Sequence, residues 1–151
     1  MQLYNLFDEV HLALQDALFM GAQSISKLAA APAQFQQLKE IAEDSLQLLH
    51  AIESTVLPAV DLFEPAVADA LLQQHRLAAI EAQRLLEALA QNAQNLQVGY
   101  NRFLCAQLHC MRKCEEMLNP VLWRYYSASE LHQLKQVLHQ KAFPQKDRQA
   151  A

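Results

Sequence analysis

Apolar side chains recur every three or four residues over four long stretches of the chain, which is the period of an amphipathic α-helix. Only two glycines and five prolines occur among 151 residues, so little of the sequence suits the tight turns of a β-protein. The hydrophobic fraction of 52% is high enough for one domain built on a single core. The sequence therefore predicts an all-α protein.

The periodic stretches predict four long helices and a shorter fifth. The second and fourth are expected to end before Pro58 and Pro120, because proline lacks the N–H that continues a helix. The sequence SASE, from Ser127 to Glu130, predicts a capping box at the start of the fifth. The expected bounds are Leu3 to about Met20, Gln34 to Leu57, Pro65 to Leu89, Leu96 to Leu118, and onward from Ser127.

Four long amphipathic helices joined by short connections bury their apolar stripes most economically side by side. We therefore expect an antiparallel up-and-down four-helix bundle with a short extra C-terminal helix. This single domain is expected to span residues 1–143, and a polar tail to span 144–151.

Charge and hydropathy exclude several classes of partner. The net charge is −4 and the basic residues form no stripe, so no nucleic acid is expected to bind. No apolar run reaches the ~18 residues of a membrane span, and the start MQLYNLFDEV lacks the basic segment of an export signal. A cytoplasmic protein without a membrane partner is expected. The sequence contains no glycine-rich loop, nucleophile elbow or spaced carboxylate pair, so no enzymatic activity is expected.

Helical phase separates the histidines and cysteines into inward and outward groups. With each residue turning the helix by about 100°, His11 and His75 fall within about 60° and 30° of the centres of their apolar stripes. Cys114 lies near the centre of the fourth stripe and Cys110 on its flank, whereas His109 shares the outward face with charged residues. Two imidazoles and two thiols facing one interior are the donors of a tetrahedral N₂S₂ metal site, although such residues are also common as packed core.

Four segments resemble the hemerythrin-like, or HHE cation-binding, family of four-helix bundles. They are NLFDEVHLALQDALF, LLHAIESTVLPAV, ALLQQHRLAAIEAQRLLEAL and HCMRKCEEMLNPVLWRYYSASEL, and together they cover most of the chain. The last is the most specific, since its succession of motifs is similar to a bacterial branch of the family. The resemblance implies a metal-binding bundle with His11 and His75 in ligand positions.

The resemblance also implies that other ligand positions have changed. Counted back from Pro58, the His and Glu positions of the second helix hold Leu48 and Ile52. Counted back from Asn119 and Pro120, those of the fourth helix hold Cys110 and Cys114. An ordinary two-iron centre would lack both of its bridging carboxylates.

Three hypotheses follow for the bundle interior. One is a binding or sensing protein with a single Zn or Fe ion held by His11, His75, Cys110 and Cys114. Another is a metal-free structural or interaction module without any cofactor, for which a homodimer is the expected partner arrangement. A third is a diiron oxygen-binding site in a shifted register, which would turn the following residues inward: His50, Glu53, His109 and Glu115.

Overall fold

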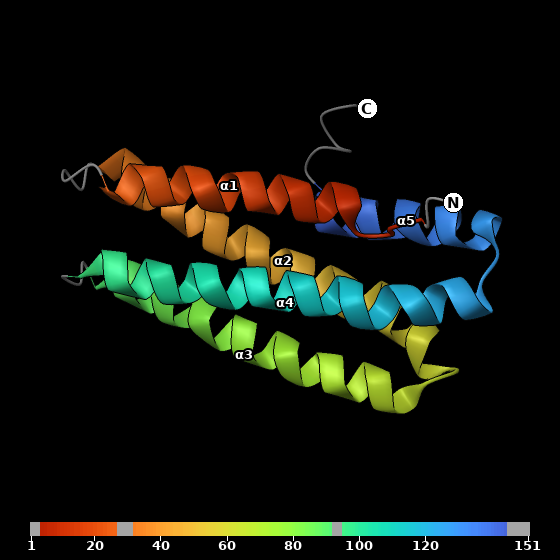
Figure 1. The fold of residues 1–151 in the computed structure, drawn as a ribbon. Coiled ribbons are helices and arrows are strands. Elements are labelled where there is room, and N and C mark those ends of the chain that lie inside the picture. Colours follow the sequence, from red (N-terminus) through yellow and green to blue (C-terminus); the bar gives the residue numbers. More distant parts are fainter. Residues whose placement is uncertain (1–3, 27–31, 92–94, 145–151) are drawn as a thin grey trace.

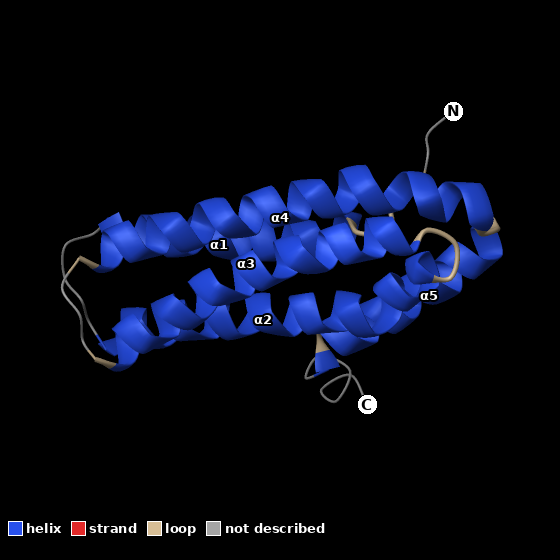
Figure 2. Cartoon of the chain, turned by 90° about the horizontal axis from the view of Figure 1, so that it is seen from below, coloured by secondary structure: helices blue, strands red, loops and turns tan. Residues whose placement is uncertain are grey.

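The computed structural model describes residues 4–26, 32–91 and 95–144, and within these ranges the regular structure is entirely helical (Figure 2). The all-α fold class is thereby confirmed. The helices are α1 (Asp8–Ser26), α2 (Pro32–Asp61), α3 (Pro65–Ala90), α4 (Leu96–Tyr125) and α5 (Ala128–Ala142).

The four long helices lie lengthwise beside one another, and α5 lies at one end of the molecule (Figure 1). Helix α1 contacts α2 and α4, and α3 contacts the same two helices from the other side. Helix α5 packs along α2, where Gln47 Nε2 donates to the Lys141 carbonyl at 2.8 Å. The apolar stripes of α1 to α4 thus meet in one interior.

Helix α1 begins later than the apolar pattern predicted and ends later too. Its first turn holds Asp8 and Glu9, whose negative charges favour a helix N-terminus, and it continues to Ser26. Lys135 of α5 lies 2.9 Å from Asp8 and 3.3 Å from Glu9, which fixes α5 against this end of α1. The predicted start at Leu3 lies outside the described residues.

Helices α2 and α4 continue through proline, so their predicted ends at Leu57 and Leu118 were wrong. Pro58 lies inside α2, which ends at Asp61, and Pro120 lies inside α4, which ends at Tyr125. Both prolines are exposed. The carbonyl that each leaves without a helical N–H partner therefore lies near solvent, where water can satisfy it.

A glycine allows α1 to approach α4 closely. A Cβ added at Gly21 would lie 2.8 Å from Tyr100 Cζ and 2.9 Å from Ile41 Cδ1, inside van der Waals contact. Tyr100 is fully buried and its hydroxyl donates to the Leu18 carbonyl at 2.5 Å, which satisfies the phenol without water. This contact holds three helices together at the end of the molecule where α1 finishes and α4 begins.

The predicted capping box opens α5. Ser127 Oγ accepts from the Glu130 N–H at 3.2 Å, and the Glu130 carboxylate accepts from the Ser127 N–H at 3.0 Å. None of the helices in the described ranges has the length and apolar character needed to cross a membrane.

Candidate functional site

A small, mostly apolar cavity lies between the first turns of α1 and the middle parts of α2, α3 and α4. The cavity has room for about one water molecule, whose centre can move within about 10 Å³. All four predicted donor residues are among those that line it. The lining residues are His11, Leu14, Ser45, Leu48, Leu49, Ile52, His75, Gln107, Cys110, Met111 and Cys114.

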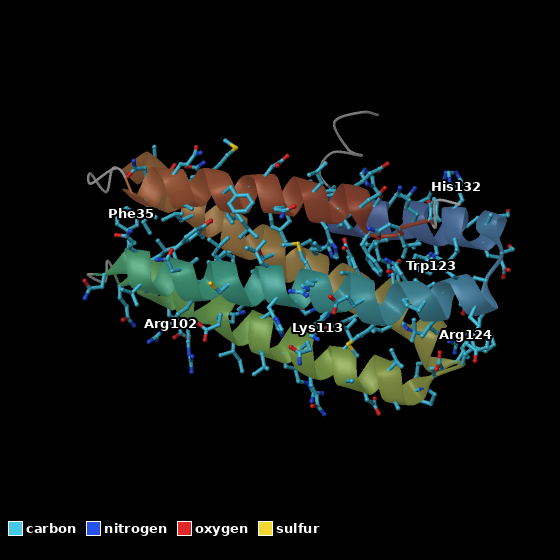
Figure 3. All side chains as sticks on the ribbon, in the orientation of Figure 1. Phe35, Arg102, Lys113, Trp123, Arg124 and His132 are labelled. Atoms are coloured by element: carbon cyan, nitrogen blue, oxygen red, sulfur yellow. The ribbon has the colours of Figure 1, made fainter. Side chains whose placement is uncertain are left out.

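Helix α4 turns both of its interior thiols toward this cavity. Cys110 is 3% exposed and Cys114 is 1% exposed, while His109, directly before Cys110, is exposed to solvent. Arg102 and Lys113, labelled in Figure 3, flank the outward face of α4, as the helical period predicted. The three cysteines are free thiols, and Cys105 is exposed.

Each buried histidine lies against a glutamate of another helix. His11 Nδ1 on α1 is 2.9 Å from Glu115 Oε1 on α4, and Phe7 stacks on the imidazole with ring centroids 5.3 Å apart. His75 Nδ1 on α3 is 3.3 Å from Glu53 Oε1 on α2. Two imidazole–carboxylate pairs therefore connect all four long helices around the cavity.

The second ring nitrogen of His75 has no partner among the described residues. Its side chain is 0% exposed, and Nε2 is buried without a hydrogen bond. A buried polar atom without any partner costs about 1–3 kcal/mol, and the cavity that His75 lines has room for a partner of about the size of one water.

Burial changes the acid–base properties of the groups that line the cavity. It lowers the pKa of His75 below 6.5, against the opposing effect of Glu53, and so favours a neutral ring. It raises the pKa of the Cys110 thiol to about 12, with the nearby Glu53 adding to the effect. Burial also raises the pKa of Cys114, followed by the effects of Cys110 and Glu115. Both thiols are protonated at neutral pH.

Glu115, which the sequence offered only for the shifted register, contacts a histidine in the observed register. Its carboxylate reaches back to His11, and this hydrogen bond lowers the pKa of Glu115 below 4.5. Glu116 is exposed and pairs instead with Arg112 at 2.9 Å. Helical phase could not reveal the first pairing, because the partner lies on another helix at a height that the sequence does not specify.

The shifted register does not occur in this structure. His50 has a side chain 75% exposed and His109 is also exposed, so neither imidazole faces the interior. Their proposed companions Glu53 and Glu115 are half-buried and lie closer to the other two histidines, although Glu53 is also 3.9 Å from His50. The two imidazoles that the diiron hypothesis requires therefore face away from the interior. Turning the His109 face inward would expose large apolar side chains of α4 to water.

The remaining ligand positions implied by the family resemblance are apolar. Leu48 is 5% exposed and Ile52 is 2% exposed, and both line the cavity. Gln107, which the sequence did not single out, donates from Nε2 to the Ala78 carbonyl at 2.9 Å. In the part of the chain that the structure describes, no three His, Cys, Asp or Glu side chains stand in an arrangement that could hold a metal ion.

Comparison with known proteins gives no relative, since no family model, no curated protein and no solved structure matches this chain.

Proposed function

We propose that the chain is an up-and-down four-helix bundle of the hemerythrin-like kind that binds one transition-metal ion in its central cavity. The ligands in this proposal are His11, His75, Cys110 and Cys114. The observation that carries the proposal is His75 Nε2, a fully buried imidazole nitrogen that has no protein partner and belongs to a ring lining the same cavity as both thiols. An atom of this kind is expected where a fold retains a ligand position.

The donor set determines the class of metal. Two imidazole nitrogens and two sulfurs favour Zn(II) or Fe(II) over Mg(II) or Ca(II), which prefer oxygen ligands. The thiols are protonated without a cation, so binding of the ion would release their protons and supply thiolate charge. The donors also need to move inward, because no three of them are close enough together as the side chains stand.

Metal analysis of the untagged protein tests the proposal. After anaerobic reconstitution with Zn(II), Fe(II) or Co(II) and removal of excess ion, we expect about one equivalent to remain. Bound Co(II) should show a thiolate-to-metal absorption band that is lost in the double variant Cys110→Ser, Cys114→Ser. Cys105→Ser is the matched control, since this exposed thiol on the same helix should not affect binding.

Two results would contradict the proposal. Retention of no metal by a folded wild-type protein would exclude the mononuclear site. Retention of about two iron equivalents with an oxo-to-iron band would restore the diiron hypothesis.

A metal-free interaction module is the second candidate function, and one surface favours it. On α1, Leu12 is 58% exposed, Phe19 47% and Met20 57%, which leaves large apolar side chains facing water along one helix. In this alternative the protein forms a homodimer through α1. Sedimentation should then show a dimer that the double variant Leu12→Gln, Phe19→Gln dissociates, whereas Leu77→Gln, Ile80→Gln on the exposed face of α3 leaves it intact.

A further inference from the structure

The two buried histidines share one arrangement, although they come from different helices. In each ring it is Nδ1 that faces a glutamate, at 2.9 Å for His11 and Glu115 and at 3.3 Å for His75 and Glu53. The glutamates come from α4 and α2, and the histidines from α1 and α3. Every long helix therefore contributes one member of a pair.

The chemistry of a carboxylate decides which nitrogen carries the proton. An ionised carboxylate has no hydrogen to donate, so the hydrogen bond requires a proton on Nδ1 of the imidazole. A neutral ring of this tautomer has its lone pair on Nε2. For His75 this nitrogen is buried and has no hydrogen-bond partner among the described residues.

The glutamates lie behind the rings rather than in the cavity. His11 and His75 both line the cavity, whereas Glu53 and Glu115 do not. Their side chains are 31% and 36% exposed, so water reaches both carboxylates and stabilises their charge. They are placed to orient the imidazoles and not to contact an ion at the centre.

From this geometry we propose that Glu53 and Glu115 are positioning residues that fix His75 and His11 as Nδ1–H tautomers and turn Nε2 of each ring toward the cavity. The consequence for metal affinity rests on the proposed function of that cavity as a metal site. Carboxylates that accept a hydrogen bond from a ligating histidine raise its basicity and hold its orientation, and their loss typically lowers metal affinity 10–100-fold.

Nitrogen NMR of the metal-free, full-length protein tests the tautomers directly. In ¹⁵N-histidine-labelled protein, above the pH range of imidazole titration, we expect two rings with the proton on Nδ1. Glu115→Ala should remove this signature from His11 only, and Glu53→Ala from His75 only. The Gln variants should keep it, because the amide oxygen still accepts. Glu116→Gln is the matched control on α4, and circular dichroism confirms that each variant is folded.

A Co(II) titration then measures the consequence for binding. We expect a 10–100-fold weaker affinity in either alanine variant and recovery of most of it in the glutamine variants. A proton on Nε2 of both rings in the wild type, or alanine variants that keep the Nδ1–H signature, would overturn the inference. If the wild type shows the expected tautomers but binds no metal, the proposed function fails while the assignment of the positioning residues stands.

Discussion

Two regions of the interior are built from the same helices in opposite ways. Where α1 ends and α4 begins, Tyr100 and Phe103 are fully buried, their rings are 5.6 Å apart, and the one buried hydroxyl donates to a carbonyl. In the central cavity, His75 is equally buried, but one of its nitrogens has no partner among the residues that the structure describes, and two thiols line the same cavity. The first region satisfies its buried polar group within the protein, while the second leaves one buried nitrogen without a protein partner among the described residues.

The largest effect should follow from emptying the apolar region. Phe103→Ala removes a fully buried ring and leaves a cavity, so the free energy of unfolding should fall by about 3–5 kcal/mol. Urea denaturation measures the loss, and Phe103→Leu should lose less than about 1.5 kcal/mol because most of the volume is kept. An equally small loss in the alanine variant would show that this region is not tightly packed.

Adding a methyl group to the same region should lower the free energy of unfolding by less than Phe103→Ala does. Gly21→Ala places a methyl group 2.8 Å from Tyr100 Cζ, and we expect a net loss of about 1–2 kcal/mol after the gain in helix propensity. Gly99→Ala is the matched control on α4, where a Cβ meets nothing within 4 Å, and it should stabilise the protein by about 0.5–1 kcal/mol. If both variants are stabilised, α1 and α4 approach less closely than described.

The cavity should make stability depend on pH in a way that the apolar region does not. Burial lowers the pKa of His75 below 6.5, so the unfolded chain takes up this proton first as the pH falls. The contribution of neutral His75 to the free energy of unfolding is therefore complete above pH 6.5. It decreases as the pH falls from 6.5 to the pKa of His75 in the folded state. The free energy of unfolding should change by no more than about 1.4 kcal/mol per pH unit through this range.

A second pH window belongs to Glu115. Its hydrogen bond to His11 lowers the pKa of the carboxyl below 4.5, so stability from this pair is present above pH 4.5 and is lost as the pH falls further. When the free energy of unfolding of the chelator-treated protein is measured by urea denaturation at a series of pH values, it should fall in two separate pH ranges, one below pH 6.5 and one below pH 4.5. His75→Leu should flatten the upper one and Glu115→Gln the lower one, whereas a single fall unaffected by either variant would refute the assignment.

The smallest predicted effect has the opposite sign. At neutral pH and without metal, His75→Leu should raise the free energy of unfolding by about 1 kcal/mol, because it removes a buried nitrogen that lacks a partner. Glu53 remains accessible to water and does not become a new buried charge. Destabilisation by His75→Leu would show that the cavity is optimised for packing, and the contrast between the two regions would disappear.

Helical phase was sufficient to predict the fold class and the inward-facing residues. The period of 3.6 placed His11, His75, Cys110 and Cys114 inside and His109 outside, since each assignment depends only on angles within one helix. Helix ends were predicted less well. Proline does not always end a helix, and α2 and α4 continue past Pro58 and Pro120, both of which are exposed so that water can reach the freed carbonyls.

The pairs of His11 with Glu115 and His75 with Glu53 lay beyond prediction for another reason. Each joins two helices, and their formation depends on the relative heights of the helices, which no single-helix pattern contains. The nearest signal was that Glu115 directly follows an inward thiol, so that its long side chain starts about 100° from the interior and can reach back.

The extension of α4 beyond Pro120 joins two distant parts of the chain. In this last stretch Trp123 Nε1 donates to the Tyr4 carbonyl, Arg124 lies 3.4 Å from Glu64, and the Tyr126 hydroxyl donates to the Ala59 carbonyl at 2.6 Å. Neighbouring residues at the end of α4 therefore hold the segment preceding α1, the last turn of α2 and the turn that follows α2. Fraying of the end of α4 should release the segment before α1 and the end of α2 at the same time, so hydrogen exchange in both segments should increase together.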